Sequence, residues 1–202
     1  MTKYAFLPVP TQEMKDFASG LGCGGDKMLR NAFLSGIGKA MDRLGGGCLK
    51  GLSPNDVLYV ICHGNRNGSN TIGVDRAEAD NEAKLAKNPD AKTRPDMKVY
   101  YAPALVALLQ KEGLPGTFEN LHLAICGSAT GASNAEGASF AQQVLGAMRL
   151  AGYSNVRVTG YFGEVETSGG NIIKRVTDPK DGVNKPFPIT DDDKGKRFVT
   201  LG

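Results

Sequence analysis

The chain has 202 residues, of which 41% are hydrophobic and 22% are charged, and its formal net charge is +3. This length suits one sizeable core and is short for two, so we expect a single domain over residues 1–202. The charge is too small to indicate nucleic-acid binding, and no apolar run is long enough to span a membrane. We therefore expect a protein that binds neither nucleic acid nor a lipid bilayer.

The cysteines and the first residues bear on the compartment. Residues 1–10 lack the long apolar segment of a secretory signal peptide, so we expect a reducing compartment and free thiols. Cys62 and His63 are metal-ligating types at short spacing, but adjacent side chains of a strand point to opposite faces. The sequence therefore predicts no metal site. The four cysteines are Cys23, Cys48, Cys62 and Cys126.

The first quarter of the chain predicts one strand and two helices. Residues 3–7 alternate and are predicted as a strand, and a helix follows from Thr11 to about residue 19. The glycine-rich segment 20–25 lacks the Gly-Lys-Ser/Thr ending of a phosphate loop and indicates a flexible turn. Asp26 is predicted to cap a second helix that runs to about Leu44, because its apolar residues recur at helical spacing.

Two short apolar runs dominate the middle of the chain. Val57–Ile61 and Leu121–Ile125 are too short for free-standing helices, and each predicts a buried strand of a parallel sheet. Between them we expect a small hairpin over residues 71–74, a polar insertion at about 75–98 and a helix over residues 101–112.

The last third of the chain continues the alternation of helix and strand. We expect a helix over residues 138–151, a strand over 156–162, a hairpin around 168–170, a loop over 178–196 and an edge strand over 197–201. This order predicts an α/β fold, a three-layer sandwich with a mostly parallel central sheet flanked by helices.

Both buried strands stop at a reactive side chain followed by glycine, His63-Gly64 and Cys126-Gly127. In open α/β sheets ligands bind at the carboxyl ends of the strands. A histidine near a cysteine can take the thiol proton and return it to the leaving group. We therefore predict Cys126 as nucleophile, His63 as general base and acid, and the N–H of Gly64 as the main oxyanion donor, with the Cys126 N–H as a second candidate. The alternative interpretation is a small buried thiol and a histidine in a turn.

The blocks Leu58-Tyr-Val-Ile-Cys-His-Gly64 and Leu123-Ala-Ile-Cys-Gly-Ser128 resemble the His and Cys blocks of the caspase-like (clan CD) cysteine peptidases. The chain is most similar to the self-processing cysteine protease domains of large bacterial toxins, in which the Cys strand precedes a helix, a strand and a hairpin with basic residues. This chain has Ser139-Phe-Ala-Gln-Gln-Val-Leu145, Val156-Arg-Val-Thr-Gly-Tyr161 and Lys174-Arg175 in that order. The resemblance covers roughly residues 55–176.

Two departures from the family stand out. Caspases have Gln-Ala-Cys where this chain has Leu-Ala-Ile-Cys. Metacaspases usually carry an aspartate two residues before the cysteine, where it helps bind a basic P1 side chain, and Ala124 occupies that position here. This argues against metacaspase-like specificity for arginine or lysine.

The resemblance implies a cysteine endopeptidase that acts on a protein or peptide, either as a bacterial effector or by self-processing. It makes Glu164 and Glu166 candidate partners for a basic P1 side chain, and Ser128 a further substrate-binding candidate. It also implies an inositol phosphate as activator at a basic patch, with no other cofactor expected. The patch would comprise Lys174, Arg175, Lys185, Lys194, Lys196 and Arg197, and the exposed cleavage candidates of the insertion are Lys84, Lys87, Lys92 and Arg94. Ordinary solubilising charge is the alternative for both sets.

Two other functions stay open. One is a non-catalytic binding module that uses the crevice at the strand ends. The other is a thiol hydrolase or acyltransferase that acts on a non-peptide or isopeptide bond. We expect the protein in the cytoplasm, or secreted as an effector without a classical signal peptide.

Overall fold

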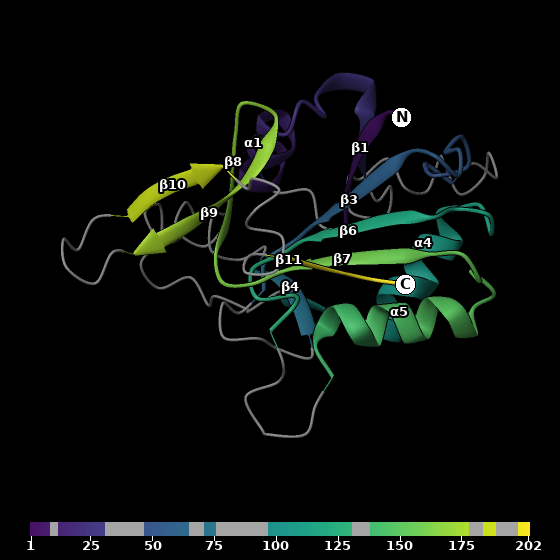
Figure 1. Ribbon diagram of the computed structural model, residues 1–202. Helices are drawn as coiled ribbons and strands as arrows, with labels where there is room; N and C mark the ends of the chain where they lie inside the picture. The colour runs from purple at the N-terminus through teal and green to yellow at the C-terminus, as the bar shows by residue number, and fades with distance from the viewer. Residues whose placement is uncertain are drawn as a thin grey trace, which may run out of the picture.

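The computed structural model describes residues 1–8, 12–30, 47–64, 71–75, 97–130, 138–177, 184–188 and 198–202. A central six-stranded sheet has the order β11-β7-β6-β3-β1-β2 (Figure 1). Its strands are β1 (Lys3–Leu7), β2 (Met28–Arg30), β3 (Val57–Ile61), β6 (Asn120–Ala124), β7 (Arg157–Tyr161) and β11 (Phe198–Leu201). All neighbours pair in parallel except β11, which is antiparallel to β7. The predicted α/β class and mostly parallel sheet are confirmed.

The two strands that carry the sequence motifs lie side by side in the middle of this sheet. All five residues of β3 are buried, as expected for a strand covered on both faces. β3 pairs with β6 in a register that sets Leu58 opposite Leu121 and Ile61 opposite Ala124. The apolar runs therefore end together at one edge of the sheet.

The helices α1 (Gln12–Gly20), α4 (Ala102–Lys111) and α5 (Phe140–Leu150) match three predicted helices. α4 has proline in its first turn, where the missing N–H costs no helical hydrogen bond. α5 begins with a capping box in which the Ser139 hydroxyl accepts from the Gln142 N–H and the Gln142 side chain accepts from the Ser139 N–H. α4 packs against α5, and α5 packs against β7.

The two faces of β6 and β7 differ in chemistry. Leu121 is paired with Val158, and both are fully buried on the face covered by α5. Gly160 shares that face, and a Cβ atom on it would lie 2.7 Å from the Cβ of Ala141 in α5. The opposite face of the same strands is polar and carries His122 beside Thr159.

The carboxyl end of α1 lies on this polar face. Burial and the charge of nearby Cys23, which follows α1, raise the pKa of Tyr59 to about 12. The Tyr59 ring in turn lies 5.0 Å from the ring of His122, measured between centroids. α1 also packs against β1, β2 and β3. Described helices therefore lie on both faces of the sheet.

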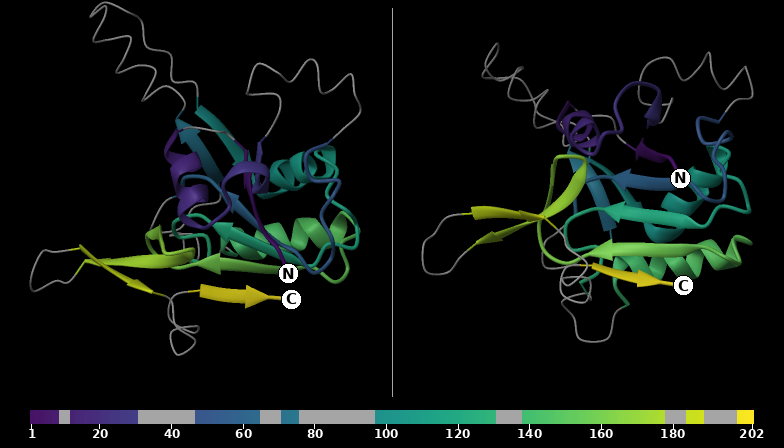
Figure 2. Two further views of the ribbon diagram at one scale, coloured as in Figure 1. Left: turned by 90° about the horizontal axis from the view of Figure 1, so that it is seen from above. Right: turned by 45° about the horizontal axis from the view of Figure 1, so that its top comes forward.

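Two smaller sheets flank the carboxyl ends of the central strands (Figure 2). One is antiparallel and formed by β8 (Val165–Ser168), β9 (Asn171–Thr177) and β10 (Asn184–Pro188), and the other pairs β4 (Thr71–Asp75) with β5 (Met97–Tyr101). The β8–β9 turn is fixed to the core because the Gly170 N–H donates to Gly20 O at 3.0 Å and the Lys3 ammonium donates to Gly170 O at 3.0 Å.

Two local predictions are wrong, and a third is met in part. No helix begins at Asp26, because residues 25–27 form a 3-10 turn and Met28–Arg30 pair in parallel with β1 at the sheet edge. The segment 178–196 contains the strand β10, which hydrogen-bonds to β9. Residues 71–74 return antiparallel to the end of the His strand, as the predicted small hairpin requires, because His63 and Gly73 form an antiparallel bridge, and β4 also pairs with β5 across the polar insertion. Tertiary pairing outweighs local pattern in the two wrong predictions.

Some predictions fall outside the described residues. These are the rest of the second helix over residues 31–44 and the interior of the insertion over residues 76–96. The single-domain organisation stays a prediction. No described helix is long and apolar enough to cross a membrane.

Candidate active site

His63 and Cys126 lie beyond the carboxyl ends of two adjacent parallel strands. The register pairs Ile61 with Ala124, the last residues of β3 and β6, and His63 and Cys126 each follow two positions later. Gly64 supports this close approach, because a Cβ atom on it would lie 2.5 Å from the carbonyl oxygen of Cys126. Only a residue without a side chain fits between the two strand ends. The structure thus brings the predicted base and nucleophile to one edge of the sheet.

A carboxylate also reaches this edge, from the helix on the polar face. The Glu13 Oε2 atom lies 3.2 Å from the His63 Nε2 atom, and both side chains are well exposed. Glu13 stands in the first turn of α1, where acidic residues are common because they stabilise any helix. Sequence reasoning missed it because nothing in its local pattern distinguishes it from such a residue.

The backbone of His63 is held by a neighbouring hairpin. The Gly73 N–H of β4 donates to the carbonyl oxygen of His63 at 3.1 Å. The main chain of His63 is therefore held by a hydrogen bond, while its ring contacts the Glu13 carboxylate.

The environment of Cys126 keeps its half-buried thiol protonated. Burial raises the pKa of Cys126, and a hydrogen bond from the Val165 N–H acts against this shift. The nearby carboxylates of Glu164 and Glu13 raise the pKa further because they repel a thiolate. A base is therefore needed before the sulfur can act as a nucleophile.

The turn after Cys126 uses most of its own N–H groups. The Gly127 N–H donates to Gly163 O at 2.8 Å, and the Ser128 and Ala129 N–H groups donate to Ile125 O and Tyr161 O. Gly127 also has φ of 65°, which glycine adopts without strain. The candidate oxyanion donors remain the N–H groups of Gly64 and Cys126.

The three predicted substrate-binding residues differ in position. Glu164 is half-buried and acts on the Cys126 thiol, whereas Glu166 lies in β8 opposite Ile173 of β9. Ser128 is only 2% exposed. Its hydroxyl donates to Leu123 O at 3.1 Å and accepts from the Tyr161 N–H at 2.9 Å. These internal bonds give Ser128 a role in holding the turn, so it is not retained as a substrate contact.

The other cysteines are also free thiols, as expected. Burial raises the pKa of Cys62 to about 12, opposed by a backbone hydrogen bond from His63. Cys23 is buried, and burial together with the Glu112 carboxylate raises the pKa of Cys48. Among the described residues, no three His, Cys, Asp or Glu side chains converge as a metal site.

The structure describes only some residues of the predicted activator patch and none of the cleavage candidates. Lys174 and Arg175 lie in β9 and Lys185 lies in β10, with Lys185 opposite Val176. The remaining members lie outside the described residues: Lys84, Lys87, Lys92, Arg94, Lys194, Lys196 and Arg197.

The fold and the site together define an α/β protein with a histidine and a cysteine at the carboxyl edge of its sheet. No protein-family model matches the sequence, and a search among curated proteins found no match. The resemblance to the caspase-like peptidases therefore rests on the two sequence motifs alone.

Proposed function

We propose that the chain is a cysteine endopeptidase of the caspase-like type, with Cys126 as nucleophile and His63 as general base and acid. The observation that carries this proposal is the pairing of β3 with β6, which ends both strands at the same edge with Gly64 against the Cys126 backbone. The layering agrees with a three-layer caspase-like sandwich, since α5 covers one face of the sheet and α1 reaches the other.

In the proposed reaction the imidazole of His63 takes the thiol proton as the Cys126 sulfur attacks the scissile carbonyl carbon. The N–H of Gly64 donates to the oxyanion of the tetrahedral intermediate. The imidazolium returns its proton to the leaving amine as the C–N bond breaks, which leaves a thioester. Water then attacks the thioester with the imidazole as base, and the carboxylic acid product and the thiol are released.

Glu13 is a positioning residue in this scheme. Its carboxylate lies 3.2 Å from Nε2 of His63 and favours the tautomer with the proton on that nitrogen. Nδ1 then carries the lone pair that accepts the thiol proton. The same carboxylate stabilises the imidazolium that forms during attack. Because the pair is exposed, its contribution to folding stability is only about 0–1 kcal/mol.

The acidic surroundings of the thiol favour a substrate with a basic P1 side chain. The Glu164 and Glu13 charges raise the pKa of Cys126, and a bound lysine or arginine beside Glu164 would offset that effect. Substrate binding would thereby ease formation of the thiolate. Glu164, which directly precedes β8, would supply the carboxylate for such a side chain, because Ala124 of β6 has none. Glu166 stays a second candidate.

The test is cleavage of a fluorogenic peptide panel with varied P1 residues, together with alkylation by a small excess of iodoacetamide. Cys126→Ala should abolish both cleavage and fast labelling. Cys48→Ala is the matched control, because Cys48 is also half-buried yet lies beside Glu112, away from the strand ends. Continued cleavage by Cys126→Ala would rule out this assignment.

The raised pKa of Cys126 also suits a second function, a non-catalytic module that binds a partner at the same edge. Such a module would show no fast labelling at Cys126 and no turnover of any peptide. Ester and isopeptide substrates in the same panel separate a thiol hydrolase or acyltransferase from a peptidase. Self-processing and activation by an inositol phosphate are checked by intact mass with and without inositol hexakisphosphate.

A further inference from the structure

A cavity of about 200 Å³ opens on the polar face of the central sheet, apart from the candidate active site. Its walls are the side chains of Asn120, His122, Arg157, Thr159 and Thr200. Asn120 and Arg157 are the first residues of β6 and β7, whereas Cys126 lies just beyond the last residue of β6. The cavity therefore lies toward the amino ends of the strands, and the proposed peptidase reaction does not use it.

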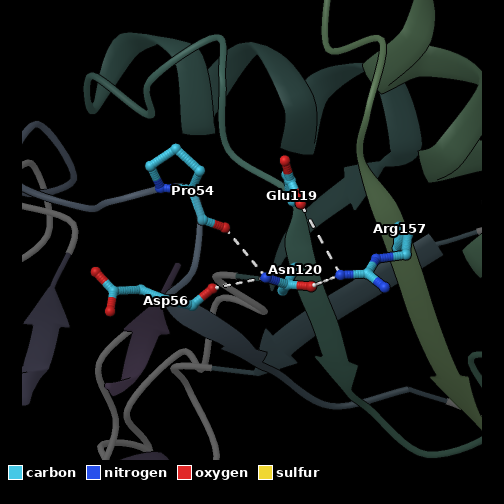
Figure 3. A network of polar contacts seen from close by, with 5 residues as sticks. All are labelled: Pro54, Asp56, Glu119, Asn120 and Arg157. Atoms are coloured by element: carbon cyan, nitrogen blue, oxygen red, sulfur yellow. Dashed lines mark hydrogen bonds and ion pairs between the residues drawn. The ribbon is translucent and has the colours of Figure 1, made fainter. Parts of the chain in front are cut away.

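A polar network fixes the side chains at the rim of this cavity (Figure 3). The Arg157 guanidinium donates to Asn120 Oδ1 at 2.7 Å and lies 3.9 Å from Glu119 Oε2. The Asn120 amide group donates to Pro54 O at 3.1 Å and to Asp56 O at 3.4 Å, which fixes the orientation of its oxygen. Arg157 has five N–H donors, and these contacts use only part of them.

The floor of the cavity offers neutral donors. His122 Nδ1 lies 3.1 Å from the Tyr161 hydroxyl, whose pKa is raised by burial so that it keeps its proton. When this hydroxyl donates to Nδ1, the imidazole proton is on Nε2, which becomes a donor. The hydroxyls of Thr159 and Thr200 lie 2.9 Å apart, and one of them has a hydrogen left for a ligand.

Two cations, Lys3 and Arg157, act near this floor. Burial and then the charge of Lys3 lower the pKa of His122 to about 4. The ring is therefore neutral near pH 7, and a bound anion would meet both the guanidinium of Arg157 and the field of Lys3. The Glu119 carboxylate forms an ion pair with the Arg157 guanidinium at 3.9 Å, too long for a hydrogen bond, so a bound anion would share the guanidinium with Glu119.

We propose that this cavity binds a small oxyanion, held by the Arg157 guanidinium, the Nε2–H of His122 and the Thr159–Thr200 hydroxyl pair. Carboxylate and phosphate groups both match these donors, and arginine can bind either one with two parallel hydrogen bonds. The volume of about 200 Å³ suits inorganic phosphate or a small dicarboxylate and is too small for an inositol hexakisphosphate. The site is thus distinct from the predicted activator patch of β9 and β10.

The chain has two histidines, so NMR of the ring carbons follows His122 directly. The intact chain is titrated with inorganic phosphate, with malonate and with inositol hexakisphosphate, at constant ionic strength set by chloride. A saturable shift of the His122 signal with phosphate or malonate, but not with chloride, is the expected result. The anion that binds more tightly identifies the ligand as a phosphate or a carboxylate.

Arg157→Gln should weaken binding about 10- to 100-fold, because it removes a charge-assisted contact. Arg149→Gln is the matched control, since Arg149 is an exposed arginine in the last turn of α5, outside the cavity. Thr200→Val keeps the shape of its residue and should weaken binding more mildly, which preserves the test if Arg157→Gln does not fold. The proposal is overturned if no anion gives a saturable shift, if Arg157→Gln and Thr200→Val bind like the parent chain, or if inositol hexakisphosphate alone binds.

Discussion

Gly64→Ala tests the contact between the two strand ends most directly. The added Cβ atom would lie 2.5 Å from the Cys126 carbonyl oxygen and 2.5 Å from Ile125 Cγ2. Cβ atoms almost never come closer than 3.0 Å and make ordinary contacts from 3.4 Å, so the end of β3 and the turn after β6 must separate by about 0.5–0.9 Å. Overpacking of this kind costs about 1–3 kcal/mol of unfolding free energy.

The same displacement should impair catalysis. A shift of about 1 Å between reacting groups costs on the order of 100-fold in rate, so we expect kcat/KM to fall about 10- to 100-fold. For a chain of this size the midpoint of thermal unfolding should fall by about 2–12 °C. Peptide hydrolysis, iodoacetamide labelling of Cys126 and a thermal melt measure the three effects.

Gly146→Ala provides the control, because Gly146 lies in α5 and a Cβ atom added to it would have open space within 4 Å. An alanine there should raise stability by about 0.5–1 kcal/mol through helix propensity and leave activity unchanged. If Gly64→Ala melts and labels like the parent chain, the residues after β3 and β6 do not meet at Gly64, and His63 and Cys126 do not form one site.

Three further predictions concern Glu13 beside the proposed base, the buried imidazole of His122 and the hydroxyl of Ser128. Glu13→Gln should lower kcat about 3- to 10-fold with little change in KM, and Glu13→Asp should restore part of the lost kcat. The control Asp16→Asn, in the same helix, should change neither kcat nor KM. An unaltered kcat in Glu13→Gln would remove the carboxylate from the mechanism. The pKa of His122 is lowered from 6.5 to about 4, so its neutral form stabilises the fold above pH 6.5 and this contribution, up to about 3 kcal/mol, is lost as the pH falls toward 4. Urea unfolding across that range measures the loss, and a His122→Gln chain with the same pH slope would contradict it. Ser128→Ala should cost about 1–3 kcal/mol in urea unfolding because it removes the buried hydroxyl that bonds the Leu123 carbonyl and the Tyr161 N–H, whereas exposed Ser154→Ala should cost almost nothing. Equal midpoints for the two variants would show that the hydroxyl is not structural.

The sequence predicts those parts of the fold in which local pattern and tertiary packing agree. The run Val57–Ile61 is apolar throughout, and a strand covered on both faces needs that composition. Ser139 with Gln142 forms a capping box that marks the start of α5 to within two residues. The same logic places His63 and Cys126 at strand ends, because the apolar runs stop there.

Other features depend on contacts that no local pattern encodes. Glu13 reaches His63 across fifty positions of the chain, and a glutamate in the first turn of a helix needs no partner to be explained. Met28–Arg30 form a strand because β1 offers an open edge, although their spacing favours a helix. The Ser128 hydroxyl bonds the N–H of Tyr161 in β7, thirty-three positions later, and the sequence of the turn does not show this contact.

The hydrogen bond from Gly73 to the carbonyl of His63 joins the imidazole to a distant part of the chain. β4 and β5 flank the segment between Asp75 and Met97 and pair with each other. The bridge between Gly73 and His63 connects this pair of strands to the residue two positions after β3. An event that alters how β4 lies against β5 therefore also alters the backbone from which the imidazole projects. Substitutions in β4 or β5 that change this pairing are therefore expected to disturb the proposed catalytic edge, although β5 begins 34 positions after His63 in the sequence.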